Sequence, residues 1–370
     1  MKITVDVNAL SGALNTVTRA LTARPVSEIM NYVLLEASDG ELVLTCTDGN
    51  FAIESRIPAQ VEETGRAAYN GRFMADVIRK LPGGEVTLTS DASLAVRIRS
   101  GAVRTSLAGM DPVEFPEMAE VEDGQHIQLP QDKLRAMISR VSFAVAADES
   151  RQILTGMLME IRPGSLRLVA LDGFRLAMQS SSAQTSVTGA EPVHLICPGR
   201  VMNELSRILP ESQEDCDICF DRKHMQIRFG STLLSTVLMA GQYIDYERIL
   251  PASFATVCRM DRGQLASAID FASLYAREAK NNLVKMKIEN STLGVSSNAE
   301  LGDFQQDLQI DQTGPMLQIA FNAKYLSDVL HSISEDEIAL KFNSSVQPCV
   351  IGPVEEGDYL YLILPVRVFQ

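Results

Sequence analysis

The sequence predicts an α+β fold of three tandem domains, each with two helices packed on antiparallel sheets. Two observations predict it: a set of local motifs that occurs three times, and a regular order of helix-like and strand-like segments within each occurrence. The clearest motif ends a strand with a tight turn, and its three copies lie 124 and 126 residues apart. These copies are Thr47-Asp48-Gly49, Leu171-Asp172-Gly173 and Ser297-Asn298-Ala299.

Two further motifs repeat with nearly the same period. One lies at the start of the first helix of each repeat, at Val7-Asn8-Ala9-Leu10, Pro130-Gln131-Asp132-Lys133-Leu134 and Asp261-Arg262-Gly263-Gln264-Leu265. The other opens the second helix, at Asn70-Gly71-Arg72, Pro198-Gly199-Arg200 and Asn322-Ala323-Lys324. A repeat of about 125 residues has the usual size of one domain. We therefore expect domains at 1–125, 126–253 and 254–370.

Apolar residues at helical spacing predict two helices in each repeat. In the first helix, Leu10, Leu14, Val17 and Leu21 follow one another at intervals of three or four residues and form one apolar face. Pro82 and Pro210 stand where two helices should stop, because proline cannot continue the helical hydrogen-bond ladder. The expected helices span 8–24, 71–82, 131–146, 198–210, 262–280 and 322–334.

Alternating apolar and polar residues predict strands between these helices. Turn signals such as Asp39-Gly40 and Ser100-Gly101 separate the alternating runs. The expected strands span 42–47, 85–89, 94–99 and 103–107 in the first repeat, 156–161, 166–171, 225–229 and 233–238 in the second, and 284–288, 293–297, 338–342 and 359–364 in the third.

The charge of the chain is unevenly distributed. The net charge is −14, yet the six helix-like ranges contain 14 Lys and Arg against 6 Asp and Glu, so they carry +8 and the remainder carries −22. If the helices share one surface, that surface attracts phosphate without reading bases, while the acidic remainder repels DNA. The charge distribution therefore favours a nucleic-acid partner despite the acidic total.

Composition and motifs argue against several other classes of protein. No apolar run is as long as a membrane span requires, and Met1 to Val5 alternate like a strand rather than a signal peptide. The six cysteines are scattered, which is typical of a protein in a reducing compartment. We therefore expect a cytoplasmic protein. Cys216 and Cys219 form a CxxC without a second ligand pair, so we expect no metal site. No catalytic or cofactor-binding motif is visible, and we expect neither catalysis nor a cofactor.

Two other functions stay open from these residues alone. A scaffold that binds peptides or polysaccharide would not retain DNA, and an enzyme with a cleft between repeats would require a metal, a cofactor or a cluster of groups with perturbed pKa values. Neither function accounts for basic helices in an acidic chain.

Several segments resemble a known family over the full length of the chain. They are Met1-Lys2-Ile3-Thr4-Val5, Asp111-Pro112-Val113-Glu114-Phe115-Pro116, Leu171-Asp172-Gly173-Phe174-Arg175-Leu176-Ala177, Asp245-Tyr246-Glu247-Arg248-Ile249-Leu250-Pro251 and Leu364-Pro365-Val366-Arg367. With the threefold repeat, they make the chain similar to the bacterial sliding DNA clamp, the β subunit of DNA polymerase III. The resemblance implies three clamp-type domains that assemble as a head-to-tail dimeric ring.

The same resemblance implies a function and partners. The ring would encircle double-stranded DNA without sequence specificity and act as a processivity factor, a non-catalytic subunit of the polymerase complex. Replicative and repair polymerases and the clamp loader would bind a peptide pocket between domains 2 and 3, and no membrane would be involved. The DNA-facing positions would be Arg24, Arg72, Arg200, Arg151 and Gln152, with Arg79, Lys80 and Arg140 as weaker candidates from helix placement.

Two further residue sets follow from the resemblance. Arg175 and Arg248 would frame the polar or acidic ends of a bound peptide. Phe174 and Ile244 replace residues that are commoner in the family, so they bear on peptide preference. The pocket positions are Leu154, Leu171, Gly173, Phe174, Arg175, Leu176, Ile244, Arg248, Ile249, Val346, Leu362, Leu364, Pro365, Val366 and Arg367. The apolar centre of the dimer interface would be Leu107, Leu274 and Tyr275, flanked by charges such as Arg97, Arg104 and Glu300.

Overall fold

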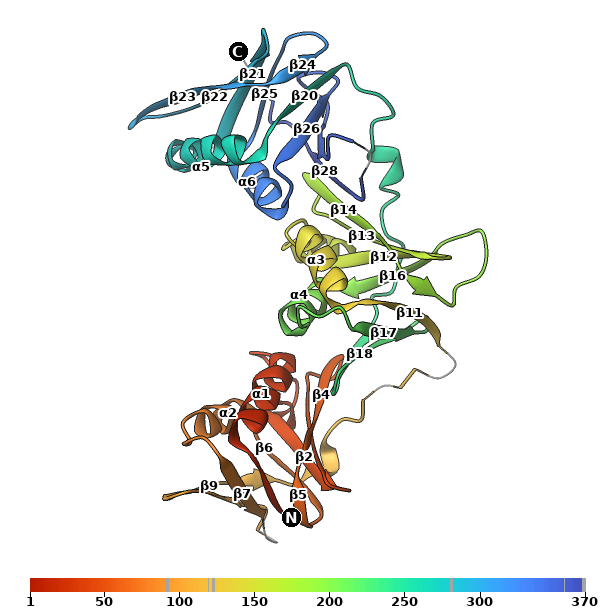
Figure 1. Cartoon of the computed structure of the whole chain (residues 1–370), viewed down its shortest axis with the longest axis vertical. Helices are drawn as coiled ribbons and strands as arrows, with labels where there is room; N and C mark the ends of the chain where they lie inside the picture. The colour runs from red at the N-terminus through yellow and green to blue at the C-terminus, as the bar shows by residue number, and fades with distance from the viewer. Residues whose placement is uncertain (91–92, 119, 122–123, 280–281, 356, 368–370) are drawn as a thin grey trace. The chain divides into compact units, whose positions relative to one another are not determined.

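The computed structural model describes residues 1–90, 93–118, 120–121, 124–279, 282–355 and 357–367. These residues form two compact units (Figure 1). The first unit comprises Met1–Asp132, Gln184–Val187 and Glu204–Leu238, and the second comprises Lys133–Ala183, Thr188–Asn203 and Met239–Gln370. The second predicted repeat thus contributes strands to both units, whereas we expected each repeat to fold around its own core.

The first unit contains two antiparallel sheets. The five-stranded sheet has the order β5-β1-β7-β8-β9, and the ten-stranded sheet has the order β10-β6-β2-β3-β4-β19-β18-β17-β11-β15. The strands are β1 Lys2–Asp6, β2 Tyr32–Ser38, β3 Glu41–Thr47, β4 Phe51–Pro58, β5 Gln60–Glu63, β6 Gly65–Asn70, β7 Glu85–Ser90, β8 Val96–Ser100, β9 Val103–Leu107, β10 Gly109–Met110, β11 Gln125–Pro130, β15 Gln184–Thr185, β17 Asp215–Phe220, β18 His224–Phe229 and β19 Thr232–Val237.

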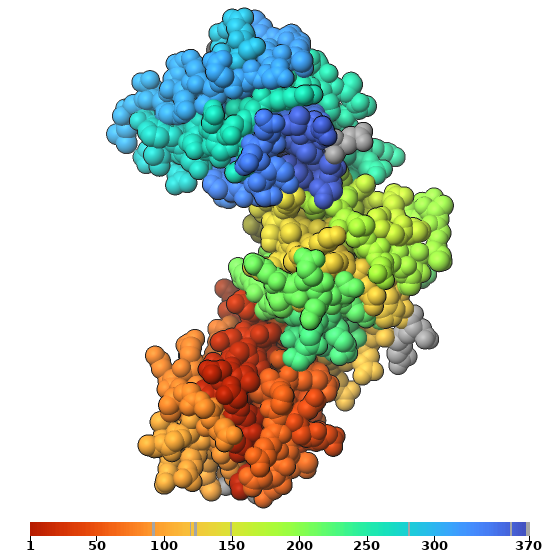
Figure 2. All heavy atoms as spheres, in the orientation of Figure 1, coloured from red at the N-terminus to blue at the C-terminus, as the bar shows by residue number. Residues whose placement is uncertain are grey.

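The second unit also contains two antiparallel sheets. Its nine-stranded sheet has the order β16-β12-β13-β14-β28-β27-β26-β20-β24, and its four-stranded sheet has the order β23-β22-β21-β25. The strands are β12 Gly156–Arg162, β13 Ser165–Leu171, β14 Arg175–Ser182, β16 Val193–Pro198, β20 Thr256–Asp261, β21 Leu283–Glu289, β22 Thr292–Ala299, β23 Gly302–Gln309, β24 Asp311–Thr313, β25 Leu317–Asn322, β26 Glu337–Phe342, β27 Cys349–Gly352 and β28 Tyr359–Ile363. Figure 2 shows the atoms of the chain as spheres, with residues 254–367 of this unit coloured teal to blue.

All six predicted helices are present in the described part of the chain, but each ends earlier than its sequence pattern. They are α1 Val7–Val17, α2 Gly71–Arg79, α3 Gln131–Ser142, α4 Gly199–Ile208, α5 Arg262–Glu278 and α6 Ala323–Ser332. After α1 a 3-10 turn, Thr18–Ala20, ends the helix, and the predicted residues 21–24 are not helical. Apolar residues such as Leu21 continue into the core beyond the helix, so the periodic pattern overestimates its length. Residue 280, predicted at the end of a helix, lies outside the described residues.

The repeated motifs begin helices through side-chain caps. Asp6, Asn70, Asp261 and Asn322 each accept a hydrogen bond from a backbone N–H in the first turn of the following helix, at 2.7 to 3.1 Å. Short polar side chains at this position satisfy donors that have no partner within the helix. Four of the described helices, α1, α2, α5 and α6, therefore begin with the same kind of side-chain cap.

In two places a strand of one predicted repeat pairs with a strand of the next repeat, so that one sheet contains both. In the first unit β4 pairs with β19, so that Ile53 lies opposite Leu234. In the second unit β14 pairs with β28, so that Leu176 lies opposite Leu362. Each large sheet is therefore built by two successive repeats.

We predict that Leu234→Ala destabilises the first unit by about 2–5 kcal/mol, because it leaves a cavity at a side chain with no exposed surface. Urea unfolding followed by circular dichroism measures the change. Val26→Ala, at an exposed site in the same unit, is the control and should change stability by less than about 0.5 kcal/mol. An equal effect of both substitutions would contradict a shared core at the β4–β19 junction.

Candidate functional site

The predicted peptide-binding residues all lie in the second unit. Leu154, Leu171, Leu176 and Leu362 form part of one buried apolar cluster that also contains Val350, Tyr243 and Tyr246. Around it, the large apolar side chains that remain exposed are Phe174, Ile244, Ile249, Val346 and Leu364. The backbone N–H of Leu364 donates to the carbonyl of Phe174 at 2.8 Å, which joins the end of β28 to the turn before β14. We call these five exposed side chains the apolar surface.

The turn that carries Phe174 has a fixed shape. Asp172 Oδ1 accepts hydrogen bonds from the backbone N–H groups of Phe174 and Arg175 at 2.9 and 3.0 Å. Gly173 has φ of +92°, a conformation that a side chain disfavours. The Asp-Gly motif is therefore required by the turn, and the turn presents Phe174 to solvent.

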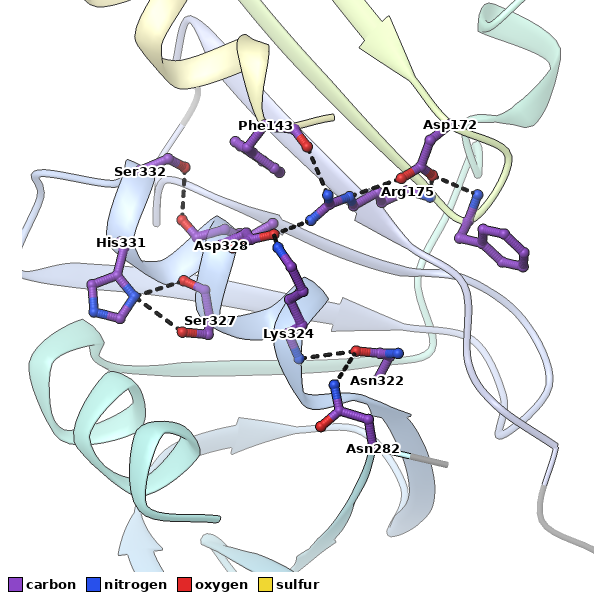
Figure 3. Close-up of polar contacts among 12 residues, drawn as sticks. Phe143, Asp172, Arg175, Asn282, Asn322, Lys324, Ser327, Asp328, His331 and Ser332 are labelled. Carbon is purple, nitrogen blue, oxygen red and sulfur yellow. Dashed lines mark hydrogen bonds and ion pairs between the residues drawn. The ribbon is translucent and has the colours of Figure 1, made fainter. Parts of the chain in front are cut away.

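Arg175 lies beneath this turn (Figure 3). Its side chain is 8% exposed, its Nε donates to Asp172 Oδ2 at 3.0 Å, its Nη1 to Asp328 Oδ2 at 2.5 Å and its Nη2 to the carbonyl of Phe143 at 2.7 Å. Without a peptide, this arginine is thus engaged within the protein, and its predicted place at the end of a bound peptide stays a prediction. The guanidinium joins the turn to α6, because burial requires its charge to be paired.

Asp328 is the second half of this buried charge pair. Burial alone would raise the pKa of Asp328, but the hydrogen bonds and charges of Arg175 and Lys324 hold it below its ordinary value. The carboxylate is therefore charged near neutral pH, and its attraction for Arg175 persists under physiological conditions.

Tyr325 is a residue that the sequence did not single out. Its ring lies 4.6 Å from the Arg175 guanidinium carbon and stacks on Phe174, with ring centroids 6.0 Å apart. Tyr325 follows the Asn322-Ala323-Lys324 motif, at the place that Phe73 occupies in the first repeat. The repeat itself was a signal for this position, but only the fold brings it against Phe174.

The segment before β20 supplies the other side of the apolar surface. A 3-10 turn at Glu247–Ile249 carries Arg248 and Ile249, and the Arg248 side chain is 86% exposed with Nε 2.8 Å from Asp245 Oδ2. Arg248 is therefore an exposed cation beside this surface, and its predicted contact with the end of a bound peptide stays a prediction.

A hollow of about 570 Å³ lies next to the same segment. It is lined by residues of β12, of the loop into β16 and of 241–247, including Glu160, His194 and Tyr246. Ile244 is the single predicted pocket residue in that lining. The hollow is thus a different place from the predicted peptide pocket.

The predicted DNA-facing residues are exposed in both units. In the first unit, Arg72 Nη2 donates to the Thr22 carbonyl at 3.4 Å, so the Arg72 side chain lies against the backbone two residues before Arg24. In the second unit, Arg200 directly follows Gly199, whose backbone lies against the Thr155 carbonyl. A Cβ added at Gly199 would be 2.7 Å from that carbonyl oxygen, so only glycine allows this close approach. Thr155 ends the 3-10 segment Glu149–Thr155 that contains Arg151 and Gln152.

The weaker DNA candidates are partly engaged elsewhere. Arg140 pairs with Glu335 at 3.1 Å and Arg79 pairs with Asp76, whereas Lys80 is exposed just beyond α2. Within the observed helix bounds there are 10 basic and 6 acidic residues, a charge of +4 rather than the +8 of the longer predicted ranges. The basic character of the helices is real but smaller than we predicted.

The predicted dimer residues differ in exposure. Leu107 on β9 is 6% exposed and therefore belongs to the core of its own unit, whereas Leu274 on α5 is 57% exposed. Tyr275 stacks with Phe271 and Phe304, two aromatic residues that the sequence analysis missed. The exposed part of the predicted interface is thus an aromatic and leucine patch on α5 and β23.

Cys216 and Cys219 form the CxxC pair noted in the sequence. Burial raises the pKa of the Cys216 thiol to about 12. The pKa of the Cys219 thiol is also raised, mainly by burial and to a smaller extent by the negative charges of Asp217 and Asp221. Neither cysteine therefore favours the thiolate form that binds metals. No helix among the described residues is long and apolar enough to span a membrane.

Family models match three consecutive parts of the chain. The N-terminal, central and C-terminal domains of the DNA polymerase III beta subunit match residues 1–119, 128–245 and 247–367. This chain belongs to the DNA polymerase III beta subunit family. The predicted family and fold class are confirmed, and the predicted function, a sliding clamp that acts as a processivity factor, is that of this family.

Individual relatives of this clamp agree with that assignment. It is 32% identical to the beta sliding clamp of Staphylococcus epidermidis over the full length of both chains. The DNA polymerase sliding clamp of Bacillus subtilis is similar in structure with a TM-score of 0.95, 30% identity and full coverage of both chains. A DnaN sliding clamp from Pseudomonas aeruginosa bound to griselimycin gives a TM-score of 0.94 at 27% identity, again with full coverage.

In this clamp we predict that Arg175→Ala lowers the free energy of unfolding by about 3 kcal/mol, because Asp328 and Asp172 would lose a buried cation. Arg248→Ala removes an arginine from the exposed side of the same surface and should cost less than about 1 kcal/mol. Chemical denaturation of both variants measures the difference. Equal stabilities would show that Arg175 is no more structural than a surface arginine.

Proposed function

We propose that this clamp closes with a second copy into a ring around duplex DNA and holds its partners through the apolar surface. The observation that carries the proposal is the full-length match to three consecutive domains of one processivity factor. A ring holds DNA by topology, so its own contacts with DNA need not be strong.

The DNA contacts proposed for this ring are Arg24, Arg72, Arg200, Arg151 and Gln152. Their exposure supports the proposal, because a guanidinium at the surface can contact phosphate without reading a base. A few such contacts position the duplex, and the net charge of −14 repels DNA elsewhere. Such a balance suits a protein that slides.

Replicative and repair polymerases and the clamp loader are the proposed occupants of the apolar surface. Exposed apolar side chains around a packed cluster support a peptide with apolar anchors, and exposed Arg248 suits an acidic or polar end. The clamp from Pseudomonas aeruginosa that is bound to griselimycin supports a ligand site in the family. A peptide affinity in the micromolar range, about −8 kcal/mol, is expected for a small apolar site.

The proposed dimer joins two edge strands of opposite charge. β9 ends the five-stranded sheet and carries Arg104, while β23 ends the four-stranded sheet and carries Asp303 and Asp307. Unpaired edges accept another strand, and the opposite charges favour a head-to-tail partner. Leu274 and the neighbouring aromatic stack would add apolar contact.

The remaining parts of the proposal concern chemistry, domains and location. We infer a non-catalytic, cofactor-free subunit of the cytoplasm with domain boundaries near residues 125 and 253. The thiol pKa values described above and the lack of catalytic motifs support the absence of chemistry.

The ring is tested by retention on DNA. The clamp is loaded with clamp loader and ATP onto nicked circular plasmid, and bound protein is measured before and after the circle is cut. Retention that is lost on cutting is expected for a topological link. Equal retention on both forms would indicate ordinary electrostatic binding, and retention on neither would favour the scaffold alternative.

The dimer is tested by charge reversal. Arg104→Glu should raise the dimer dissociation constant at least about tenfold, since a rim charge of the wrong sign faces Asp303 and Asp307. Analytical ultracentrifugation measures it, with Arg66→Glu on the internal strand β6 as the control. Restoration of dimerisation by Asp303→Lys with Asp307→Lys in the same chain would support the pairing, and an unchanged dimer in Arg104→Glu would oppose it.

A further inference from the structure

One face of the sheet formed by β16, β12, β13 and β14 is divided into stripes. Cross-strand pairs place His194, Glu160, Arg167 and Ser180 in one row from β16 to β14. Two residues along the strands, the next row consists of Ile196, Leu158, Val169 and Met178. Because side chains two residues apart point to the same face, the polar row lies beside an apolar row on that face.

The segment before β20 is fixed to the polar row by Tyr246. The Tyr246 hydroxyl donates to Glu160 Oε2 at 2.8 Å and accepts from Arg167 Nη1 at 3.0 Å. Arg167 Nη1 also lies 3.6 Å from Glu247 Oε1, and Arg167 Nε donates to Ser180 Oγ at 3.1 Å. One hydroxyl therefore ties this segment to two neighbouring strands.

The Glu160 carboxylate makes the attachment specific. Glu160 and Tyr246 are each 4% exposed, and Arg162 Nε donates to Glu160 Oε1 at 2.9 Å. Burial by itself would raise the pKa of Glu160, but the hydrogen bonds from Tyr246 and Arg162 and the charges of Arg167 and Arg162 hold it below its ordinary value. A buried carboxylate that loses a donor is costly, so the hydroxyl is held to this place.

The same tyrosine sets the backbone that carries the apolar surface. The Tyr246 carbonyl accepts from the backbone N–H of Ile249 at 3.0 Å, which closes the 3-10 turn containing Arg248 and Ile249. Ile244 lies two residues before Tyr246 on the same segment, and both isoleucines are exposed. The positions of two of the five members of the apolar surface thus depend on where Tyr246 is anchored.

We propose that Tyr246, anchored by Glu160 and Arg167, is a positioning residue that holds Ile244 and Ile249 in place and thereby sets the affinity of the clamp for partner peptides. The inference rests on the proposed partner-binding function. Tyr246 itself is buried, so its effect on a peptide is exerted through the exposed residues of its segment. Its contribution lies in keeping the segment ordered before a peptide arrives, so that binding does not have to order it.

The test uses the full-length clamp and a fluorescein-labelled peptide copied from the clamp-binding segment of the replicative polymerase of the same organism. Fluorescence anisotropy gives the affinity of wild type, Tyr246→Phe and Tyr243→Phe. Tyr243 is the matched control, since it is a buried tyrosine of the same segment whose hydroxyl donates to the Gly156 carbonyl at 3.4 Å and not to the polar row. We expect Tyr246→Phe to weaken binding about tenfold and Tyr243→Phe less than about twofold.

Two further readouts separate positioning from general stability. Hydrogen exchange in the free protein should speed up at the Ile249 amide in Tyr246→Phe, while amides in β12 and β13 stay protected. In a double-mutant cycle with Ile249→Ala, the two losses of affinity should be less than additive, because Tyr246 acts through Ile249. Glu160→Gln keeps an acceptor for the hydroxyl and should weaken binding less than Tyr246→Phe.

The outcomes are distinguishable. Failure of the wild-type clamp to bind the peptide would overturn the proposed partner-binding function. Binding by wild type with unchanged affinity in Tyr246→Phe would overturn the positioning role alone. Equal losses in Tyr246→Phe and Tyr243→Phe, with faster exchange throughout the sheet, would also overturn it and indicate a merely structural contribution.

Discussion

The backbone pairing of β14 with β28 is the interaction on which the apolar surface depends. It places Leu176 of the second repeat opposite Leu362 of the third, and it extends the sheet without a break between the two repeats. A shift of this register by one residue would turn each leucine to the opposite face of the sheet. The apolar surface therefore includes residues of both repeats and is complete in neither alone.

Buried charges then fix the parts of the surface that the sheet does not. Arg175 joins the Asp-Gly turn to α6 through Asp328, and Glu160 holds Tyr246 over the sheet. Buried ion pairs add little net stability, because desolvation offsets much of the attraction, but an unpaired partner is costly. They therefore specify the position of the turn and of the segment before β20 more than they stabilise the fold.

The positive charge available to a ligand comes from individual arginines, because some arginines on the helices are paired with carboxylates. Two arginines that we predicted on helices form ion pairs with carboxylates, Arg79 with Asp76 and Arg140 with Glu335. Arg24 and Arg72 are both exposed, and the Arg72 side chain donates to the Thr22 carbonyl. Under the proposed function, a few exposed arginines on an acidic protein attract a duplex without binding it tightly, as sliding requires.

The sequence by itself determined the threefold repeat, the α+β class, the helix starts and the family. These features are local or periodic. A helix-capping residue such as Asp6, a turn such as Asp172-Gly173 or an apolar helix face depends on residues close together in the sequence, so each can be recognised without the tertiary structure. The tertiary structure alone decided that strands of successive repeats share sheets, that Arg175 is buried and that Tyr325 meets Phe174. Those outcomes depend on pairings between residues more than 100 positions apart, and no local pattern records which distant strand or carboxylate a residue will meet.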